Sequence, residues 1–179
     1  MFFTILLVSC GIVRKNDPVQ TETINRDSPD EIINYSEQST WLLGYFNPLQ
    51  MASFPHDRWY LKGFEGYEPD SEVIERLKNL SDSELTITIV MGTWCPDSRR
   101  EVPRFMKILD ALKFPAGNVK FIGVDDVKIA PVEEYFTLNI QRVPTMIFYK
   151  NKVEAGRIIE NPVTSLEQDM ENILKGLEN

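Results

Sequence analysis

The sequence of 179 residues (20.7 kDa) has the length of one domain and is long enough to bury a hydrophobic core. Hydrophobic residues make up 42% of the chain and charged residues 26%, which excludes a wholly disordered polymer. The net charge of −8, with no basic run, argues against a nucleic-acid partner held through its phosphates. Two cysteines, Cys10 and Cys95, and one histidine, His56, are too few ligands for a structural zinc site. The sequence implies no metal and no organic cofactor.

The N-terminal residues 1–9 form an uncharged apolar run, which is too short for a membrane-spanning helix of about 20 residues. One interpretation is a buried first strand, and the other is the end of an export signal. Leu7-Val8-Ser9-Cys10 resembles the lipobox of bacterial lipoproteins, in which the cysteine becomes the lipidated first residue of the mature chain. We favour the lipoprotein interpretation because residues 10–30 carry Asn, Asp and Pro with little apolar periodicity and so predict a flexible tether. The resemblance implies that lipidated Cys10 is the membrane contact and that the body lies on the extracytoplasmic, periplasm-facing side of a bacterial membrane.

Residues 31–84 form a lead-in that is rich in aromatic side chains. Partial helical spacing, interrupted by prolines and glycines, predicts a helical extension made of short pieces. Asp70 is placed to cap the last of these helices, which runs through Leu80. We expect the aromatic rings to pack on the main sheet rather than to line a ligand pocket. His56 is predicted to be a surface turn residue.

The second half of the chain alternates strand and helix patterns. The β-branched apolar run at 85–91 predicts a buried strand, and a helix with an apolar stripe from Val102 to Leu112 follows it. The later elements are a strand at 119–124, a helix from Pro131, strands at 145–149 and 153–159, and a last helix with a capping box of Thr164 and Glu167. Parallel strands joined by helices and then an antiparallel hairpin predict an α/β fold, in which a central mixed sheet carries helices on both faces.

Cys95 follows the first strand of this half and opens its helix. Unpaired N–H groups and the positive end of the helix dipole favour a thiolate over a thiol at such a position. Pro96 suits the first helical position because its missing N–H is not needed there. Arg99 and Arg100 lie within one turn and would stabilise the thiolate, whereas Asp97 would oppose them. Because thiolates attack disulfides, Cys95 is a candidate nucleophile.

Two segments carry a resemblance to a known family. Trp94-Cys95-Pro96-Asp97-Ser98 with Pro103 resembles the proline-kinked active-site helix of the thioredoxin family, and residues 142–152 resemble its cis-proline segment and hairpin. The resemblance covers residues 85–179 and implies a thioredoxin-like domain there, with residues 31–84 outside it.

The same resemblance assigns roles to single residues. It implies a cis peptide bond between Val143 and Pro144, close to Cys95, and a substrate backbone that docks on Val143, Pro144 and Thr145. Trp94 and Pro96 would shape the remainder of the substrate site.

The chain differs from the thioredoxin family at two positions that determine the family's mechanism. Ser98 stands in place of the second cysteine, and Ile89 in place of a buried carboxylate. A single thiolate can form a mixed disulfide but cannot release it by itself. We therefore expect monothiol thiol–disulfide exchange, of the reductase or isomerase type, on exported proteins, with protein or small-molecule thiols and disulfides as partners. Ser98 is expected to donate a hydrogen bond to the Cys95 sulfur, and the protein to be a monomer.

Two alternatives stay open. The first is a catalytically degenerate thioredoxin-fold binding module, in which Cys95 is only a small hydrophobic side chain. The second is a one-cysteine thiol peroxidase. It ranks last because Gly92 stands where peroxidases of this fold place a threonine, three residues before the cysteine.

Overall fold

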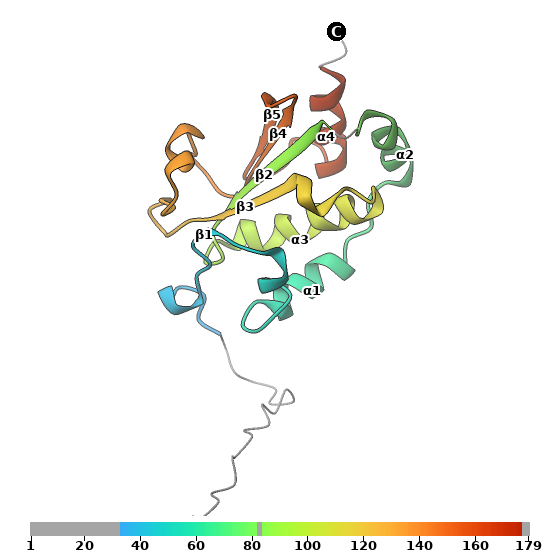
Figure 1. Cartoon of the computed structure of the whole chain (residues 1–179). Helices are drawn as coiled ribbons and strands as arrows, with labels where there is room; N and C mark the ends of the chain where they lie inside the picture. Colours follow the sequence, from blue (N-terminus) through green and yellow to red (C-terminus); the bar gives the residue numbers. More distant parts are fainter. Residues whose placement is uncertain (1–32, 82–83, 177–179) are drawn as a thin grey trace, which may run out of the picture. The chain divides into compact units, whose positions relative to one another are not determined.

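A five-stranded mixed sheet with the strand order β1-β3-β2-β4-β5 forms the centre of the fold (Figure 1). The computed structural model describes residues 33–81 and 84–176. Strand β2 is parallel to β3, and the other neighbouring pairs are antiparallel. The strands are β1 (Gly44–Tyr45), β2 (Leu85–Met91), β3 (Val119–Gly123), β4 (Thr145–Lys150) and β5 (Val153–Ile159). This order confirms the expected α/β class and its thioredoxin-like mixed sheet.

Helices cover the two faces of the sheet unequally. The α-helices are α1 (Asp57–Glu65), α2 (Ser71–Leu80), α3 (Pro96–Ala111) and α4 (Leu166–Lys175). The short 3-10 helices are η1 (Gln38–Thr40), η2 (Pro48–Gln50), η3 (Ala116–Asn118) and η4 (Glu133–Thr137). Of the elements described, η4 is the helical piece that lies with the second face, where its Tyr135 is buried. The helix expected from Pro131 is thus reduced to η4, and Asn139, with a left-handed φ of 53°, follows its end.

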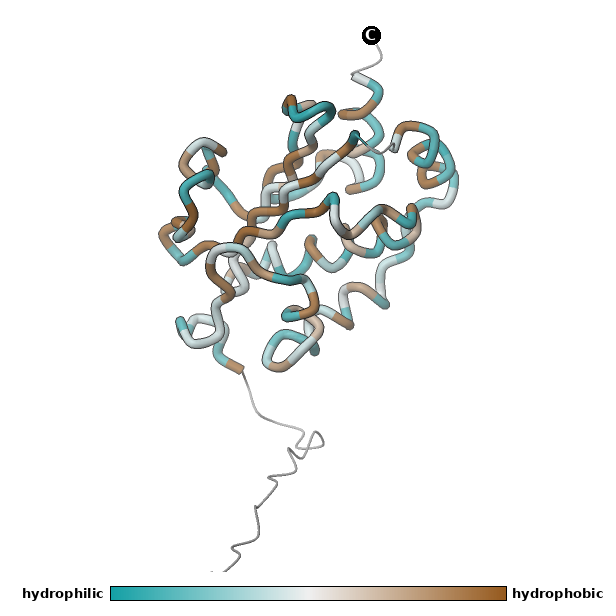
Figure 2. The backbone as a smooth tube through the Cα atoms, in the orientation of Figure 1, coloured by the Kyte–Doolittle hydropathy of each residue, from teal (hydrophilic) through white to brown (hydrophobic). Residues whose placement is uncertain are grey.

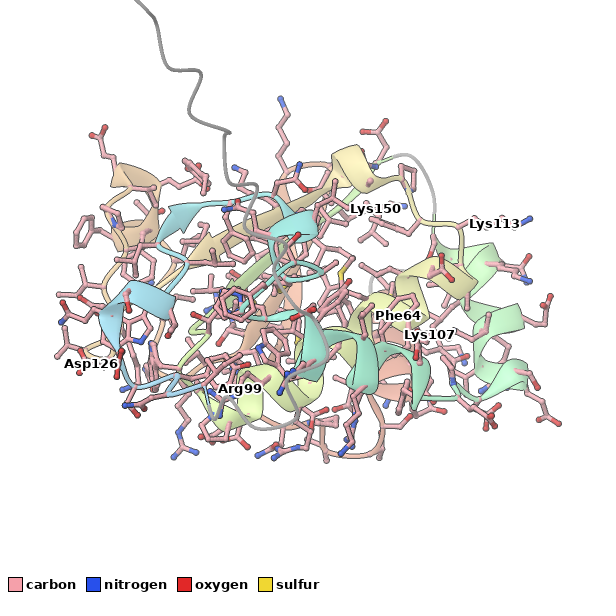
Figure 3. The ribbon with its side chains drawn as sticks, turned by 90° about the horizontal axis from the view of Figure 1, so that it is seen from below. Phe64, Arg99, Lys107, Lys113, Asp126 and Lys150 are labelled. Atoms are coloured by element: carbon pink, nitrogen blue, oxygen red, sulfur yellow. The ribbon has the colours of Figure 1, made fainter. Side chains whose placement is uncertain are left out.

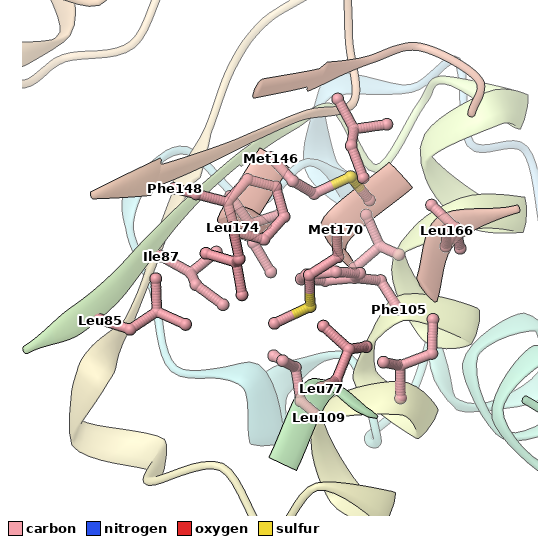
Figure 4. Packing of buried hydrophobic residues seen from close by; sticks show 14 of the residues in the cluster. Leu77, Leu85, Ile87, Phe105, Leu109, Met146, Phe148, Leu166, Met170 and Leu174 are labelled. Carbon is pink, nitrogen blue, oxygen red and sulfur yellow. The ribbon is translucent and has the colours of Figure 1, made fainter. Parts of the chain in front are cut away.

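The main core lies between the sheet and the α-helices. Hydrophobic residues gather along the central strands and on the helix sides that meet them (Figure 2). Alternate residues of β2 divide between the faces, with Ile87 and Ile89 in the main core and Val90 in a second cluster. Phe105 of α3 meets Phe148 of β4 edge to face, with ring centroids 5.9 Å apart, at the centre of the main core (Figure 4).

Residues 31–84 contribute a strand to the sheet as well as helices. Gly44 and Tyr45 pair with Gly123 and Ile122 of β3, so β1 forms one edge. Gly44 has a φ of 71°, a conformation that suits glycine. An added Cβ on Gly123 would lie 1.9 Å from the carbonyl oxygen of Leu42, so this edge depends on a residue without a side chain.

We expect Gly123→Ala to lower the free energy of unfolding by about 1–3 kcal/mol, because the Leu42 backbone must move away from β3. Gly117→Ala is the matched control, since its Cβ would meet nothing within 4 Å. Urea unfolding of both variants measures the difference. Equal stability of the two variants would contradict the close approach.

Side chains at the start of α4 differ from the expected capping box. Ser165 is the N-cap, and its side chain accepts a hydrogen bond from the Gln168 N–H at 3.2 Å. Glu167 is buried instead, where it accepts hydrogen bonds from the Tyr67 hydroxyl at 2.7 Å and the Asp70 N–H at 3.0 Å. The predicted capping box of Thr164 and Glu167 was therefore wrong, because the Glu167 carboxylate binds Tyr67 and Asp70, which are distant in the sequence.

A buried carboxylate also joins α2 to α4. Glu171 pairs with Arg76 at 2.6 Å and with Lys175 at 2.7 Å. Hydrogen bonds from Arg76 and then from Lys175 lower the pKa of Glu171 to about 2. Because its pKa in the unfolded chain is about 4.3, the ionised form stabilises the fold above that pH, and this contribution is lost as the pH falls towards 2.

We accordingly expect Glu171→Gln to lower the melting temperature more at pH 7 than at pH 3. Glu75→Gln, in an exposed i,i+3 pair with Lys78, should change it little at either pH. Thermal melts at the two pH values measure both variants. An equal effect of Glu171→Gln at both pH values would contradict a stabilising carboxylate.

Candidate functional site

Cys95 stands at the junction of strand β2 and helix α3, where it is the N-cap of α3. Its backbone is extended, with φ −78° and ψ 123°, and its N–H donates to the Gly92 carbonyl at 3.0 Å. Pro96 follows at the first helical position and is exposed. Cys95 itself is 6% exposed and packs in the second hydrophobic cluster. The sulfur therefore lies under the surface, at the start of a helix.

The loop before strand β4 lies against the cysteine. The peptide bond between Val143 and Pro144 is cis, in agreement with the resemblance to thioredoxins. The Cys95 thiol donates to the Val143 carbonyl oxygen, with the two atoms 3.4 Å apart. Thr145 is 1% exposed, and its hydroxyl donates to the Arg142 carbonyl at 2.7 Å, so it closes this loop from inside. The structure thus brings Cys95, Val143 and Pro144 together.

Ser98 is fully buried one turn further along α3. Its hydroxyl oxygen accepts a hydrogen bond from the Gly92 N–H at 3.3 Å. Among the described residues, no hydrogen bond joins this hydroxyl to the Cys95 sulfur, contrary to the expectation. The reason is geometric, because the side chain lies under the loop that leaves β2 and is bonded to the backbone there.

The two arginines after the cysteine have different surroundings. Arg99 donates from one nitrogen to the carbonyls of Thr93 and Trp94, at 3.0 and 2.9 Å. Its guanidinium lies 4.5 Å from the centre of the Tyr35 ring, and within the described residues it has no carboxylate partner. Burial lowers the pKa of Arg99, which the charges of Tyr35 and Cys95 oppose. Figure 3 marks Arg99 in the first turns of α3.

Arg100, in contrast, is neutralised by carboxylates. It pairs with Asp97 at 2.6 Å and with Glu101 at 2.5 Å, and it also donates to the side chain of Asn161. These pairs raise its pKa, the hydrogen bond to Glu101 most of all. Arg99, and not Arg100, therefore holds the loop that carries Cys95.

Trp94 fixes the other side of this loop. Its indole N–H donates to the Val124 carbonyl at 3.0 Å, and its ring meets that of Trp41 at 6.5 Å between centroids. A Cβ on Gly92 would lie 2.5 Å from the indole. Gly92, which stands where peroxidases of this fold place a threonine, is thus a position where only glycine leaves room for Trp94.

The N-terminal segment takes part in the site, which the sequence patterns did not reveal. Thr93, 1% exposed, donates from its hydroxyl to the Thr40 carbonyl and accepts from the Leu42 N–H, both at 3.2 Å. Tyr35 supports Arg99, and Trp41 supports Trp94. The density of aromatic residues in this segment was the available signal, but it did not indicate what the rings contact.

His56 is buried, which corrects its expected place on the surface. It is 2% exposed, and its ring stacks on Tyr35 at 6.1 Å and meets Trp59 edge-on at 5.8 Å. Burial lowers the pKa of His56, and the charge of Arg99 lowers it further. The ring is consequently neutral at pH 7.

Cys10 and the rest of residues 1–32 lie outside the described residues. In the described part, no helix has the length and apolar character needed to span a bilayer.

Comparisons with known proteins give likeness to solved structures alone. No family model and no curated protein matches the chain. A protein of unknown function from Pseudomonas aeruginosa is 16% identical (TM-score 0.46), over 68% of this chain and 81% of its own. An HIV epitope-scaffold is 15% identical (TM-score 0.48), over 76% and 93%. Thioredoxin O2 from Arabidopsis thaliana is 22% identical (TM-score 0.39), over 65% and 84%.

Proposed function

We propose that this protein performs monothiol thiol–disulfide exchange at Cys95. The observation that carries the proposal is the contact of the Cys95 sulfur, at the N-terminus of α3, with the Val143 carbonyl before Pro144. An extended substrate on this loop would bring its disulfide to the sulfur. Arg99 is the cation that faces the same loop without a carboxylate partner among the described residues.

The reaction is an exchange without net oxidation of the protein. The Cys95 thiolate attacks one sulfur of a substrate disulfide, which forms a bond between Cys95 and that sulfur and releases the other as a thiolate. A second thiolate, from the substrate or a small-molecule thiol, then attacks the mixed disulfide and releases Cys95. Ser98 cannot perform this second step, because a hydroxyl forms no disulfide. The products are a rearranged disulfide and an unchanged protein.

Mass spectrometry after incubation with glutathione disulfide tests the proposal. We expect one glutathione on the peptide that contains Cys95, its removal by reduced glutathione, and no adduct on the same peptide of Cys95→Ala. Absence of the adduct on the folded wild-type protein would overturn the proposal. Rapid oxidation of Cys95 by hydrogen peroxide, without reaction with the disulfide, would favour a thiol peroxidase instead.

A binding module without redox chemistry is the second candidate. The burial of Cys95, 6% exposed, and the hydrogen bond that its thiol donates favour it. Such a module would leave the native thiol unreactive toward both glutathione disulfide and iodoacetamide, although the unfolded chain would react. The same samples therefore distinguish the two functions.

We further propose that the protein is lipidated at Cys10 and acts on exported proteins outside the cytoplasm. The lipobox-like Leu7-Val8-Ser9-Cys10 and the tether composition after it support this location. In a bacterial host, the wild-type chain should incorporate labelled fatty acid and sediment with membranes, whereas Cys10→Ala should do neither. Equal behaviour of the two would contradict the anchor.

A further inference from the structure

A hollow of about 430 Å³ lies in the N-terminal segment, beside the loop that carries Cys95. Residues 39–42 form one wall, and residues between Asn47 and His56 form the other. Its volume falls in the range of about 300–1,000 Å³ that is usual for ligand pockets. Because the expected role of this segment was only to cover the sheet, the hollow was not predicted. We call it the Trp41 pocket.

The wall of the Trp41 pocket is uncharged. Of the residues that line it, none is Asp, Glu, Lys or Arg, although charged residues make up 26% of the chain. Its apolar members are Trp41, Leu42, Leu49, Phe54 and Pro55. A charged ligand would lose its hydration here without gaining a partner of opposite charge. The wall therefore selects a neutral ligand.

Four polar side chains of the wall have an oxygen that is hydrogen-bonded within the protein. Asn47 accepts a hydrogen bond from the Leu49 N–H at 2.9 Å, and Gln50 accepts one from the Asn47 N–H at 3.1 Å. The hydroxyls of Thr40 and Ser53 donate to backbone carbonyls, at 2.7 and 3.1 Å. With these oxygens engaged, the larger side chains that the wall offers a ligand are apolar or aromatic.

His56 lines the pocket with an uncharged ring. Its Nδ1 is buried and has no hydrogen-bond partner in the described part of the chain. The neutral state of the ring agrees with the uncharged wall.

Residues that line the Trp41 pocket contact the Cys95 loop. The ring of Trp41 meets that of Trp94, which directly precedes Cys95. Thr40 and Leu42 are hydrogen-bonded to Thr93 in the same loop. A polypeptide that crosses Trp94 toward Cys95 would therefore pass the rim of the pocket.

We propose that the Trp41 pocket binds an uncharged aromatic side chain of the polypeptide whose disulfide reacts at Cys95. This inference rests on the proposed function of Cys95. Trp41 lines the pocket, and aromatic rings pack favourably against one another. At the rim, Leu49 and Phe54 are each 71% exposed, and the same side chain would cover them. The pocket thus selects substrates by an aromatic residue near the disulfide.

Binding of three small probes tests the pocket without any redox step. N-acetyl-phenylalaninamide is neutral, N-acetyl-phenylalanine is an anion, and phenylalaninamide carries a positive charge. We expect the neutral probe to shift the indole NMR signal of Trp41, and the two charged probes to bind at least about tenfold more weakly. Equal binding of the three probes, or no shift by the neutral one, would overturn the proposal.

Two variants locate the binding. Leu49→Glu places a charge on the rim at an exposed position and should weaken the neutral probe about tenfold. Val153→Glu is the matched control, 69% exposed at the start of β5, and should bind as the wild type does. Equal affinity of the two variants would place the probe elsewhere and overturn the proposal.

A disulfide peptide with or without a neighbouring phenylalanine links the pocket to exchange. The phenylalanine should raise kcat/KM for the wild type and the Val153→Glu variant, and not for Leu49→Glu. A raised kcat/KM in Leu49→Glu would overturn the selection of substrates by the pocket. If Cys95 exchanges with no disulfide while the neutral probe still binds at Trp41, the proposed function fails and the pocket stands, so the two failures are distinguishable.

Discussion

Ser98→Cys is expected to turn the protein into a dithiol reductase. The variant supplies a second sulfur one turn after Cys95, on the same helix and beside the same loop. After Cys95 forms a mixed disulfide, the thiolate that the substitution introduces at position 98 can attack it, close an internal disulfide and release the substrate as a dithiol. No external thiol is then required.

A single-turnover assay without other thiols measures this gain. The substrate is a peptide with an internal disulfide. The variant should release this peptide with two free thiols and lose two hydrogens itself, whereas the wild type should stop as the mixed disulfide with the peptide. We expect a cost of about 1 kcal/mol in the free energy of unfolding, because sulfur accepts the Gly92 N–H less well than oxygen does. Ser98→Ala is the control that removes the hydroxyl without adding a sulfur.

The outcome decides between two explanations of Ser98. A variant that oxidises internally and reduces the peptide shows that the site lacks only its resolving sulfur. A folded variant that forms neither an adduct nor an internal disulfide would mean that Cys95 is not reached by substrate. The binding module would then be the better description of the fold.

Local sequence patterns predicted the helices and strands that carry their own run or stripe of buried apolar residues. The apolar run of β2 matches the strand at residues 85–91, and Asp70 caps α2 through the N–H groups of Glu72 and Val73 as expected. The position of Cys95 at the start of α3 also follows from neighbouring residues. In each case the determining contacts lie within a few positions along the chain.

Contacts between distant residues account for what the sequence did not reveal. Strand β1 has two residues, too few for a period, and its pairing depends on the missing side chain of Gly123. His56 is surrounded by Tyr35 and Trp59, a packing that no turn pattern indicates. The hydrogen bonds of Thr93 span more than fifty positions. These contacts between distant residues depend on the folded topology, and no pattern of neighbouring residues indicates them.

Arg99→Gln is expected to slow exchange at Cys95 more than any other change of a charged residue in α3. The substitution removes a cation that faces the Cys95 loop and weakens the two bonds to the carbonyls of Thr93 and Trp94. We expect the rate of mixed-disulfide formation at pH 7 to fall about tenfold, because the Cys95 loop loses a neighbouring positive charge and is held less rigidly.

Arg100→Gln is the matched control, since the Arg100 charge is already paired with Asp97 and Glu101. It should leave the rate almost unchanged. Arg99→Lys should fall between the two, because lysine keeps the charge but lacks the planar group that packs over Tyr35. Equal losses in Arg99→Gln and Arg100→Gln would contradict a special role for Arg99.

Tyr35→Leu extends this test to the N-terminal segment. Without the ring at 4.5 Å, Arg99 loses a cation–π contact and is free to leave the carbonyls of the loop. The exchange rate should therefore fall in the same direction as in Arg99→Gln, and the double variant should lose little more than Arg99→Gln alone. Additive losses would mean that Tyr35 acts on the site by another route, for instance through its hydroxyl, which donates to the Pro55 carbonyl at 2.7 Å. Non-additive losses would establish that Tyr35, in the segment before β1, positions Arg99, which in turn holds the Cys95 loop.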